Sequence, residues 1–305
     1  SIDYSKTEPH NGYDFPTPFS ITTRSVRNQL ACFATTTTEE THEVLLLGFS
    51  RSPMFTGRIQ GAGPRYCPSI EDKIDRFVER NSHVIVLEPE GLSTDTVYVN
   101  GFSTSLPSDI QDTGLRSIPA LEQAVVLRYG YAVEYDFFYP YQLTFGLETK
   151  ALKNLFFAGQ INGTSGYEEA ASQGLVAGIN AALAVRGEGT FKLQRSESYI
   201  GVLIDDLVNK STEEPYRIFT SLAEYRLLLR IDTVYQRLSK YGKDIGLIND
   251  YTWKIIQRKQ ELFDSLTQRV TTEKIPSQQI NGYLSTLGED VVSESTSIHS
   301  ITKRP

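Results

Sequence analysis

The chain has 305 residues with a hydrophobic content of 39%, a charged content of 22% and a formal net charge of −7. This composition is typical of a folded globular protein of about two domains, and the acidic balance argues against indiscriminate nucleic-acid binding. Two cysteines are too few for a disulfide framework or a four-cysteine zinc site, which favours a reducing compartment.

The first half of the chain alternates loop, strand and helix signals. Residues 1–30 are polar and broken by proline and glycine, so we expect a loop. Residues 31–38 have strand character. We expect a short helix that begins at residue 39 and ends near residue 48. A further helix is predicted over 69–79, with Ser69 as its N-cap. Its expected apolar face consists of Ile70, Ile74, Phe77 and Val78.

The next predicted elements are short. We expect strands at residues 83–88 and 96–100, separated by a turn at 89–91, and a short helix over 107–117. Strand character returns at 124–135. No apolar run approaches the roughly 18 residues that a membrane span requires.

A glycine-rich loop at residues 159–166 is the first candidate binding site. It lies between an apolar run, 154–158, and a small, helix-compatible segment, 167–184, which is the order of a βα unit in dinucleotide-binding folds. Its glycines let the backbone approach a ligand, and the helix offers free N–H groups. Glu168 and Glu169 would repel a phosphate, which favours the ribityl or isoalloxazine part of a flavin. The alternative is a tight turn that binds no ligand.

A second candidate is Cys67. It lies two residues before the predicted N-cap Ser69 and two residues after Arg65, and both the helix dipole and the guanidinium would lower the pKa of its thiol. A structural cysteine in a turn is the alternative. His42 and His83 have no partners at ligand or triad spacing, so we interpret them as structural.

The third candidate is basic. If a helix begins near Ser221, Arg226 and Arg230 are i,i+4 neighbours, and two guanidinium groups on one face suit phosphates. The alternative is a solvated ion-pair face in which Glu213 and Glu224 neutralise the arginines.

Several motifs occur in a characteristic order. They are Arg51–Phe55, Gly63–Lys73, Leu87–Gly91, Asn100–Pro107, Gly130–Phe138, Phe157–Thr164, Gly166–Ala171 and Gly201–Leu207. Together they closely resemble the glucose-inhibited division protein A family, also written GidA or MnmG. The resemblance is dense from Ala31 to Leu238 and looser beyond.

The resemblance implies an enzyme that modifies the wobble uridine of tRNA at C5. It implies FAD as cofactor, NADH as its reductant and methylenetetrahydrofolate as donor of the one-carbon unit of an aminomethyl or carboxymethylaminomethyl group. The expected partners are tRNA, a MnmE-type GTPase and a second copy of the chain. The expected location is the cytoplasm, or the mitochondrion if the source is eukaryotic, with no membrane contact.

The resemblance also implies site residues. Cys67 would be catalytic, its thiolate adding to C6 of the uracil to make C5 nucleophilic. FAD would contact Gly159, Gln160, Asn162, Gly163, Thr164, Gly166, Tyr167 and Glu168. NAD would contact Gly63, Pro64, Arg65, Tyr66, Cys67, Pro68, Ser69, Ile70, Glu71, Asp72 and Lys73. The tRNA would contact Arg65, Arg217, Arg226 and Arg230. No metal ligands are predicted.

The implied fold class is mixed α/β, a fragment of a flavoprotein of the two-dinucleotide-binding type. We expect an α/β insertion domain on the NAD and substrate side at 1–148, the C-terminal βα segment of an FAD-binding domain at 149–190, and the start of a helical domain at 191–305. The family's N-terminal glycine-rich fingerprint has no counterpart before Ala31, so we expect this chain alone to bind FAD poorly and to be inactive.

Some positions depart from the family's pattern and put the tRNA-facing segment in question. They are Leu222, Ile231, Thr233, Val234 and Tyr235. Together with the missing fingerprint, they leave open a second interpretation, a non-catalytic interaction remnant of the family. The alternative enzyme is the related folate- and FAD-dependent tRNA uridine methyltransferase.

Overall fold

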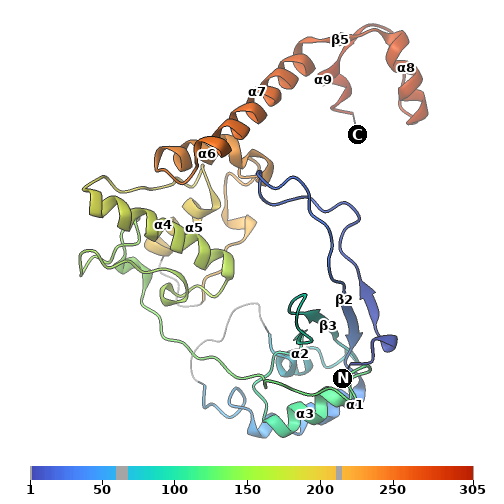
Figure 1. Ribbon diagram of the computed structural model, residues 1–305, viewed down its shortest axis with the longest axis vertical. Coiled ribbons are helices and arrows are strands. Elements are labelled where there is room, and N and C mark those ends of the chain that lie inside the picture. Colours follow the sequence, from blue (N-terminus) through green and yellow to red (C-terminus); the bar gives the residue numbers. More distant parts are fainter. Residues whose placement is uncertain (1, 60–67, 211–214, 305) are drawn as a thin grey trace. The chain divides into compact units, whose positions relative to one another are not determined.

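The computed structural model describes residues 2–59, 68–210 and 215–304 of a mixed α/β chain (Figure 1). Its contacts define two compact units. Unit 1 comprises Ser1–Thr17 and Ser25–Leu229, and unit 2 comprises Pro18–Arg24 and Arg230–Pro305. The boundaries expected at residues 148 and 190 stay predictions.

Unit 1 contains a four-stranded antiparallel sheet in which the strands follow the chain order. The strands are β1 (Glu8–His10), β2 (Cys32–Thr36), β3 (Val84–Pro89) and β4 (Val97–Asn100). The strands predicted at 83–88 and 96–100 are confirmed. The loop predicted for residues 1–30 is wrong at β1, because pairing with β2 supplies the hydrogen-bond partners that make a short polar segment extended.

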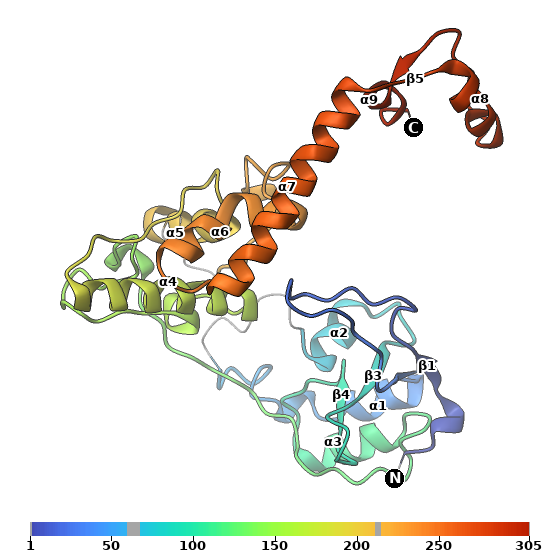
Figure 2. The ribbon, with the colours of Figure 1, turned by 45° about the horizontal axis from the view of Figure 1, so that its top comes forward.

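Three helices pack with this sheet and are visible beside it in Figure 2. They are α1 (Glu39–Leu46), α2 (Ile70–Arg76) and α3 (Ser108–Arg116). Ile85 and Leu87 alternate inward along β3 and are fully buried with residues of all three helices. The N-cap is confirmed, since the Ser69 hydroxyl accepts from the Asp72 N–H at 3.2 Å. Phe77 and Val78 are exposed, because the helix ends at Arg76, earlier than predicted.

A second core lies between residues 143 and 208, where α4 (Tyr167–Arg186) packs against α5 (Tyr199–Lys210). The helix predicted after the glycine loop is confirmed. The strand predicted at 124–135 is wrong, and residues 154–158 form only one bridge, between Glu148 and Phe156. A strand requires a neighbouring strand for its backbone. The described residues provide none along 124–135, and 154–158 pairs only with the short segment 147–149.

Unit 2 is mainly helical. It contains α6 (Val234–Asp244), α7 (Asp250–Thr272), α8 (Ser277–Thr286), α9 (Ile298–Ile301) and the short paired strands β5 (Lys274–Ile275) and β6 (Thr296–Ser297). Short 3-10 turns in the chain are Tyr4–Lys6, Phe49–Arg51, Pro140–Gln142, Gly159–Asn162, Thr220–Leu222 and Ile231–Thr233. Within the residues described, no helix is long and apolar enough to cross a membrane.

Candidate functional site

The glycine loop folds into a 3-10 turn, Gly159–Asn162, followed directly by a left-handed residue and then by α4. Gly163 has a φ of 73°, a conformation that other residues adopt only with strain. Gly166 faces a different constraint, because a Cβ there would lie 1.7 Å from Oε2 of Glu169. The sequence at these two positions therefore follows from backbone geometry and close approach.

A buried amide, Gln173, fixes the loop on α4. Its Oε1 accepts from the N–H of Gly159 at 3.1 Å and from Nδ2 of Asn162 at 2.7 Å. Its Nε2 donates to the hydroxyl of Thr164 at 2.9 Å, and that hydroxyl donates to the carbonyl of Gly159 at 3.0 Å. Both polar atoms of the Gln173 side chain are thus used to hold the loop.

Three buried oxygens around the loop have no hydrogen-bond partner among the residues described. They are Asn162 Oδ1, Ser165 Oγ and Glu169 Oε2. An unpaired buried acceptor costs about 1–3 kcal/mol, so such groups mark places where a ligand or water binds. The amide oxygen of Asn162 and the carboxylate oxygen of Glu169 can only accept hydrogen bonds. They fit hydroxyl or N–H groups of a ligand, such as ribityl or isoalloxazine groups, and they do not fit a bare phosphate.

The segment 216–218 lies against the same loop. The Tyr216 N–H donates to the carbonyl of Gly163 at 2.8 Å, next to a parallel bridge between Thr164 and Tyr216. Oε1 of Glu169, in the first turn of α4, accepts from Nε of Arg217 and from the N–H of Ile218, each at 3.0 Å. The loop is therefore held by α4 on one side and by this distant segment on the other.

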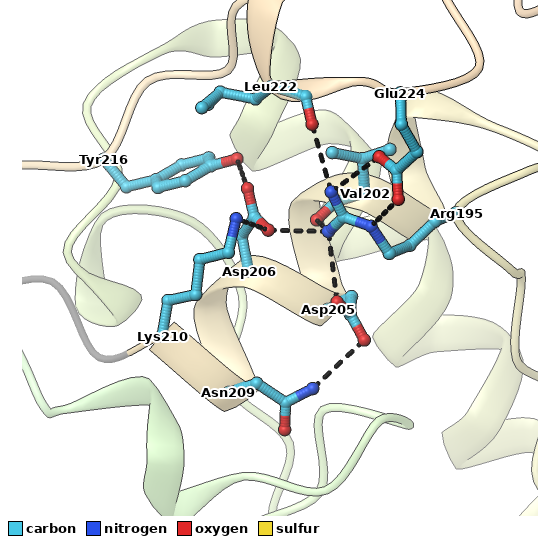
Figure 3. A network of polar contacts seen from close by, with 9 residues as sticks. All are labelled: Arg195, Val202, Asp205, Asp206, Asn209, Lys210, Tyr216, Leu222 and Glu224. Carbon is cyan, nitrogen blue, oxygen red and sulfur yellow. Dashed lines mark hydrogen bonds and ion pairs between the residues drawn. The ribbon is translucent and has the colours of Figure 1, made fainter.

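A charged network centred on Arg195 holds the 216–218 segment in place (Figure 3). Arg195 Nη1 lies 2.6 Å from Asp206 Oδ1, and its Nε donates to Glu224 at 2.7 Å. Asp206 also accepts from the hydroxyl of Tyr216 at 2.9 Å and from Nζ of Lys210 at 2.7 Å. The network links α5 to both ends of the stretch from Tyr216 to Glu224.

The network shifts the protonation equilibria of its members. The hydrogen bond from Arg195 lowers the pKa of Glu224 from 4.5 to about 2. The same bond to Glu224, followed by those to Asp206, raises the pKa of Arg195. Burial and the adjacent charge of Asp206 raise the pKa of Tyr216, so its hydroxyl stays protonated and acts as a donor.

The predicted FAD residues lie where the loop was expected, but they differ in exposure. Gly159, Asn162, Gly163, Thr164 and Gly166 are buried. Gln160, Tyr167 and Glu168 are exposed. The loop thus presents a buried polar inner side and an exposed rim.

The cysteine motif is described only in part. Cys67 and four residues predicted with it, Gly63, Pro64, Arg65 and Tyr66, lie outside the described residues. In the described remainder, Pro68–Lys73, the side chains of Ser69, Glu71 and Lys73 have partners within the chain. Glu71 is fully buried and accepts from the N–H and the hydroxyl of Ser105 at 2.7 and 2.8 Å, and Lys73 donates to the carbonyl of Gly101.

The basic segment differs from its prediction. A continuous helix does not form after Ser221, since residues 224–228 are turns. Arg217 is paired with Glu169, and Arg230 is paired with Asp232 at 2.7 Å. Arg226 is exposed and has no ion pair within the described ranges. Glu224 pairs with Arg195, so in the alternative of an ion-pair face Glu224 is not the partner of Arg226 or Arg230. Glu213 lies outside the described residues.

Sequence reasoning missed Gln173, Arg195 and Asp206. Gln173 carried a usable signal, because it and Asn180 are amides spaced seven residues apart within residues 170–185, which are otherwise small or apolar. Both are buried, as that spacing on one face would predict. Within the residues described, no group of three or more potential metal ligands occurs.

Comparison with known proteins gives a consistent result over the whole chain. The family model described as Glucose inhibited division protein A matches residues 1–189. A relative from Chlorobium phaeovibrioides, named tRNA uridine 5-carboxymethylaminomethyl modification enzyme MnmG, is 52% identical over 307 residues, which cover 100% of this chain and 49% of the relative. A relative of the same name from Thermodesulfovibrio yellowstonii is also 52% identical, with the same shares covered.

Solved structures agree. A structure of Aquifex aeolicus GidA matches with a TM-score of 0.83 and 42% identity, covering 98% of this chain and 47% of that one. A second crystal form of the same protein matches with a TM-score of 0.82. The chain spans about half the length of the curated relatives it matches.

Proposed function

The chain belongs to the glucose inhibited division protein A family, and we propose that it forms part of an FAD-dependent enzyme that modifies the wobble uridine of tRNA at C5. The observation that carries this proposal is the match of the whole chain, at 52% identity, to relatives named for tRNA uridine 5-carboxymethylaminomethyl modification. We thus assign to this chain a part in the reaction for which these relatives are named.

The glycine loop is the proposed flavin contact. FAD, when bound, supplies the redox chemistry, and the residues of this chain bind and orient it. The unpaired oxygens of Asn162, Ser165 and Glu169 support this role, because they offer acceptors to hydroxyl or N–H groups. The glycines predicted from the sequence permit the close approach, and Gln173 keeps the loop in place.

Cys67 is the proposed catalytic nucleophile, with its thiolate adding to C6 of the uracil. We further propose methylenetetrahydrofolate as one-carbon donor, NADH as reductant with its contact in Gly63–Lys73, and a MnmE-type GTPase and a second copy of the chain as partners. The proposed setting is the cytoplasm. Chemical precedent in cysteine nucleophiles supports the thiolate step, since the thiolate is the reactive form of the side chain.

The test uses the protein expressed from its complete gene in a bacterial strain that lacks its own homologue. Mass spectrometry of nucleosides from its tRNA measures the modification of the wobble uridine. We expect the wild type to restore it, Cys67→Ser to abolish it, and Cys32→Ser to leave it unchanged. Cys32 is the matched control, because it is the chain's other cysteine and lies half-buried in β2.

Each other outcome has a defined meaning. Normal modification by Cys67→Ser would refute the role of Cys67. A product with only a methyl group at C5 would favour the uridine methyltransferase. A wild type that restores nothing, and that carries no flavin absorbance after purification, would favour the non-catalytic remnant.

A further inference from the structure

Glu169 is the most deeply buried acidic side chain beside the glycine loop. The residue is 2% exposed and lies in the first turn of α4. One oxygen, Oε1, accepts from both Arg217 and Ile218, and these two bonds compensate for burying the charge. The other oxygen, Oε2, has no partner among the described residues. One carboxylate therefore holds the distant segment with one oxygen and leaves the second for another donor.

The unpaired oxygen faces the loop. A Cβ built on Gly166 would lie 1.7 Å from Oε2 and 2.8 Å from Nε of Arg217. The loop backbone, the carboxylate and the guanidinium thus meet at one point. A shift of any one of them requires a shift of the others, because the carboxylate and the guanidinium pack so closely on Gly166 that a methyl group on its Cα would not fit.

We propose that Glu169 is a positioning residue that couples occupancy of the glycine loop to the placement of the 216–218 segment. A hydroxyl or N–H donor of the ligand binds Oε2 and orients the carboxylate, and the oriented carboxylate fixes Arg217 and Ile218 through Oε1. The coupling is reciprocal, so a change at Arg217 also alters ligand affinity. The identity of the ligand as FAD rests on the proposed function.

Hydrogen exchange tests the coupling in the protein expressed from its complete gene. Peptides covering residues 159–173 report on the loop, and peptides covering 215–222 report on the segment. We expect FAD to slow exchange in both sets of the wild type. In Glu169→Gln, the positions of Oε1 and Oε2 hold one amide nitrogen, which donates, and one uncharged oxygen. The side chain can then no longer accept strongly at both positions, so FAD should still protect the loop but no longer the segment. FAD affinity should fall about tenfold, the size of one charge-assisted hydrogen bond.

The control is Glu188→Gln, which makes the same change in an exposed carboxylate just beyond the other end of α4, 3.9 Å from Arg186. It should match the wild type in both readouts. Arg217→Gln provides a second route if Glu169→Gln does not fold. It leaves the residues of the loop unchanged, and reciprocity predicts a weaker affinity for FAD although Arg217 does not belong to the loop.

The outcomes separate the two proposals. If the wild type shows no protection of residues 159–173 by FAD, the flavin site and the coupling both fall. If FAD protects the loop but Glu169→Gln and Arg217→Gln bind FAD and protect the segment as the wild type does, the flavin site stands and the coupling is refuted.

Discussion

The buried aspartate of the charged network offers the most quantitative test of the fold around the site. The side chain of Asp206 is 1% exposed and accepts from Arg195, Lys210 and Tyr216. The change Asp206→Asn keeps the shape but leaves two cations facing an uncharged group. Removing one partner of a buried ion pair costs about 3–5 kcal/mol, and because Asn retains one acceptor oxygen we expect a loss of about 3 kcal/mol.

The neighbouring residue is the matched control. The side chain of Asp205 is 29% exposed and lies 3.0 Å from the same guanidinium. We expect Asp205→Asn to cost only about 0–1 kcal/mol, as for other solvated pairs. At about 2–4 °C per kcal/mol, the melting temperature should fall by about 6–12 °C for Asp206→Asn and by less than about 4 °C for the control. Scanning calorimetry measures both. Equal, small shifts would refute the reasoning that burial decides the strength of this network.

Three further perturbations have defined outcomes. The pKa of Glu224 is lowered from 4.5 to about 2, so its ion pair stabilises the fold fully above pH 4.5 and is lost towards pH 2. Glu224→Gln should therefore lose less unfolding free energy than the wild type between pH 4.5 and pH 2. The same pH dependence in both proteins would contradict this. Burial lowers the pKa values of His42 and His83 from 6.5, so the unfolded chain takes up protons first and stability should fall as pH drops below 6.5. Urea unfolding at several pH values measures how steeply the unfolding free energy falls below pH 6.5. An equally steep fall in His83→Asn would be the contrary result. Gly163→Ala should cost about 1–2 kcal/mol in the same assay because of its left-handed backbone, while Gly174→Ala, in open space on α4, should be neutral or stabilising.

Local signals in the sequence predicted much of the fold. The Ser69 cap, the helix at 39–48 and the strand at 83–88 were confirmed, because each depends on residues a few positions apart. The strand expected at 124–135 was wrong for a physical reason. Its β-branched and aromatic residues suit a sheet, but a strand also requires a neighbour, and neighbours are set by the tertiary fold.

The site shows the same division. The glycines of the loop were predictable, since turns and close approach restrict the residue type locally. The contacts that hold the loop were not, because they join residues far apart in the chain. Gln173 and Gly159 are 14 positions apart, Arg195 and Glu224 are 29 apart, and Arg217 and Glu169 are 48 apart. No periodicity or motif spacing connects such pairs.

These long-range contacts change how the basic residues relate to the proposed tRNA substrate. Arg217 is half-buried on a carboxylate that is 1% exposed, so releasing it to a phosphate would leave a buried charge unpaired. Arg230 and Asp232 are 64% and 55% exposed, and breaking such a pair costs about 0–1 kcal/mol, which a phosphate can replace. Arg226 is exposed and needs no release. Arg226 and Arg230 are therefore the better candidates for phosphate contact, and Arg217 is better explained as a group that holds the glycine loop in place.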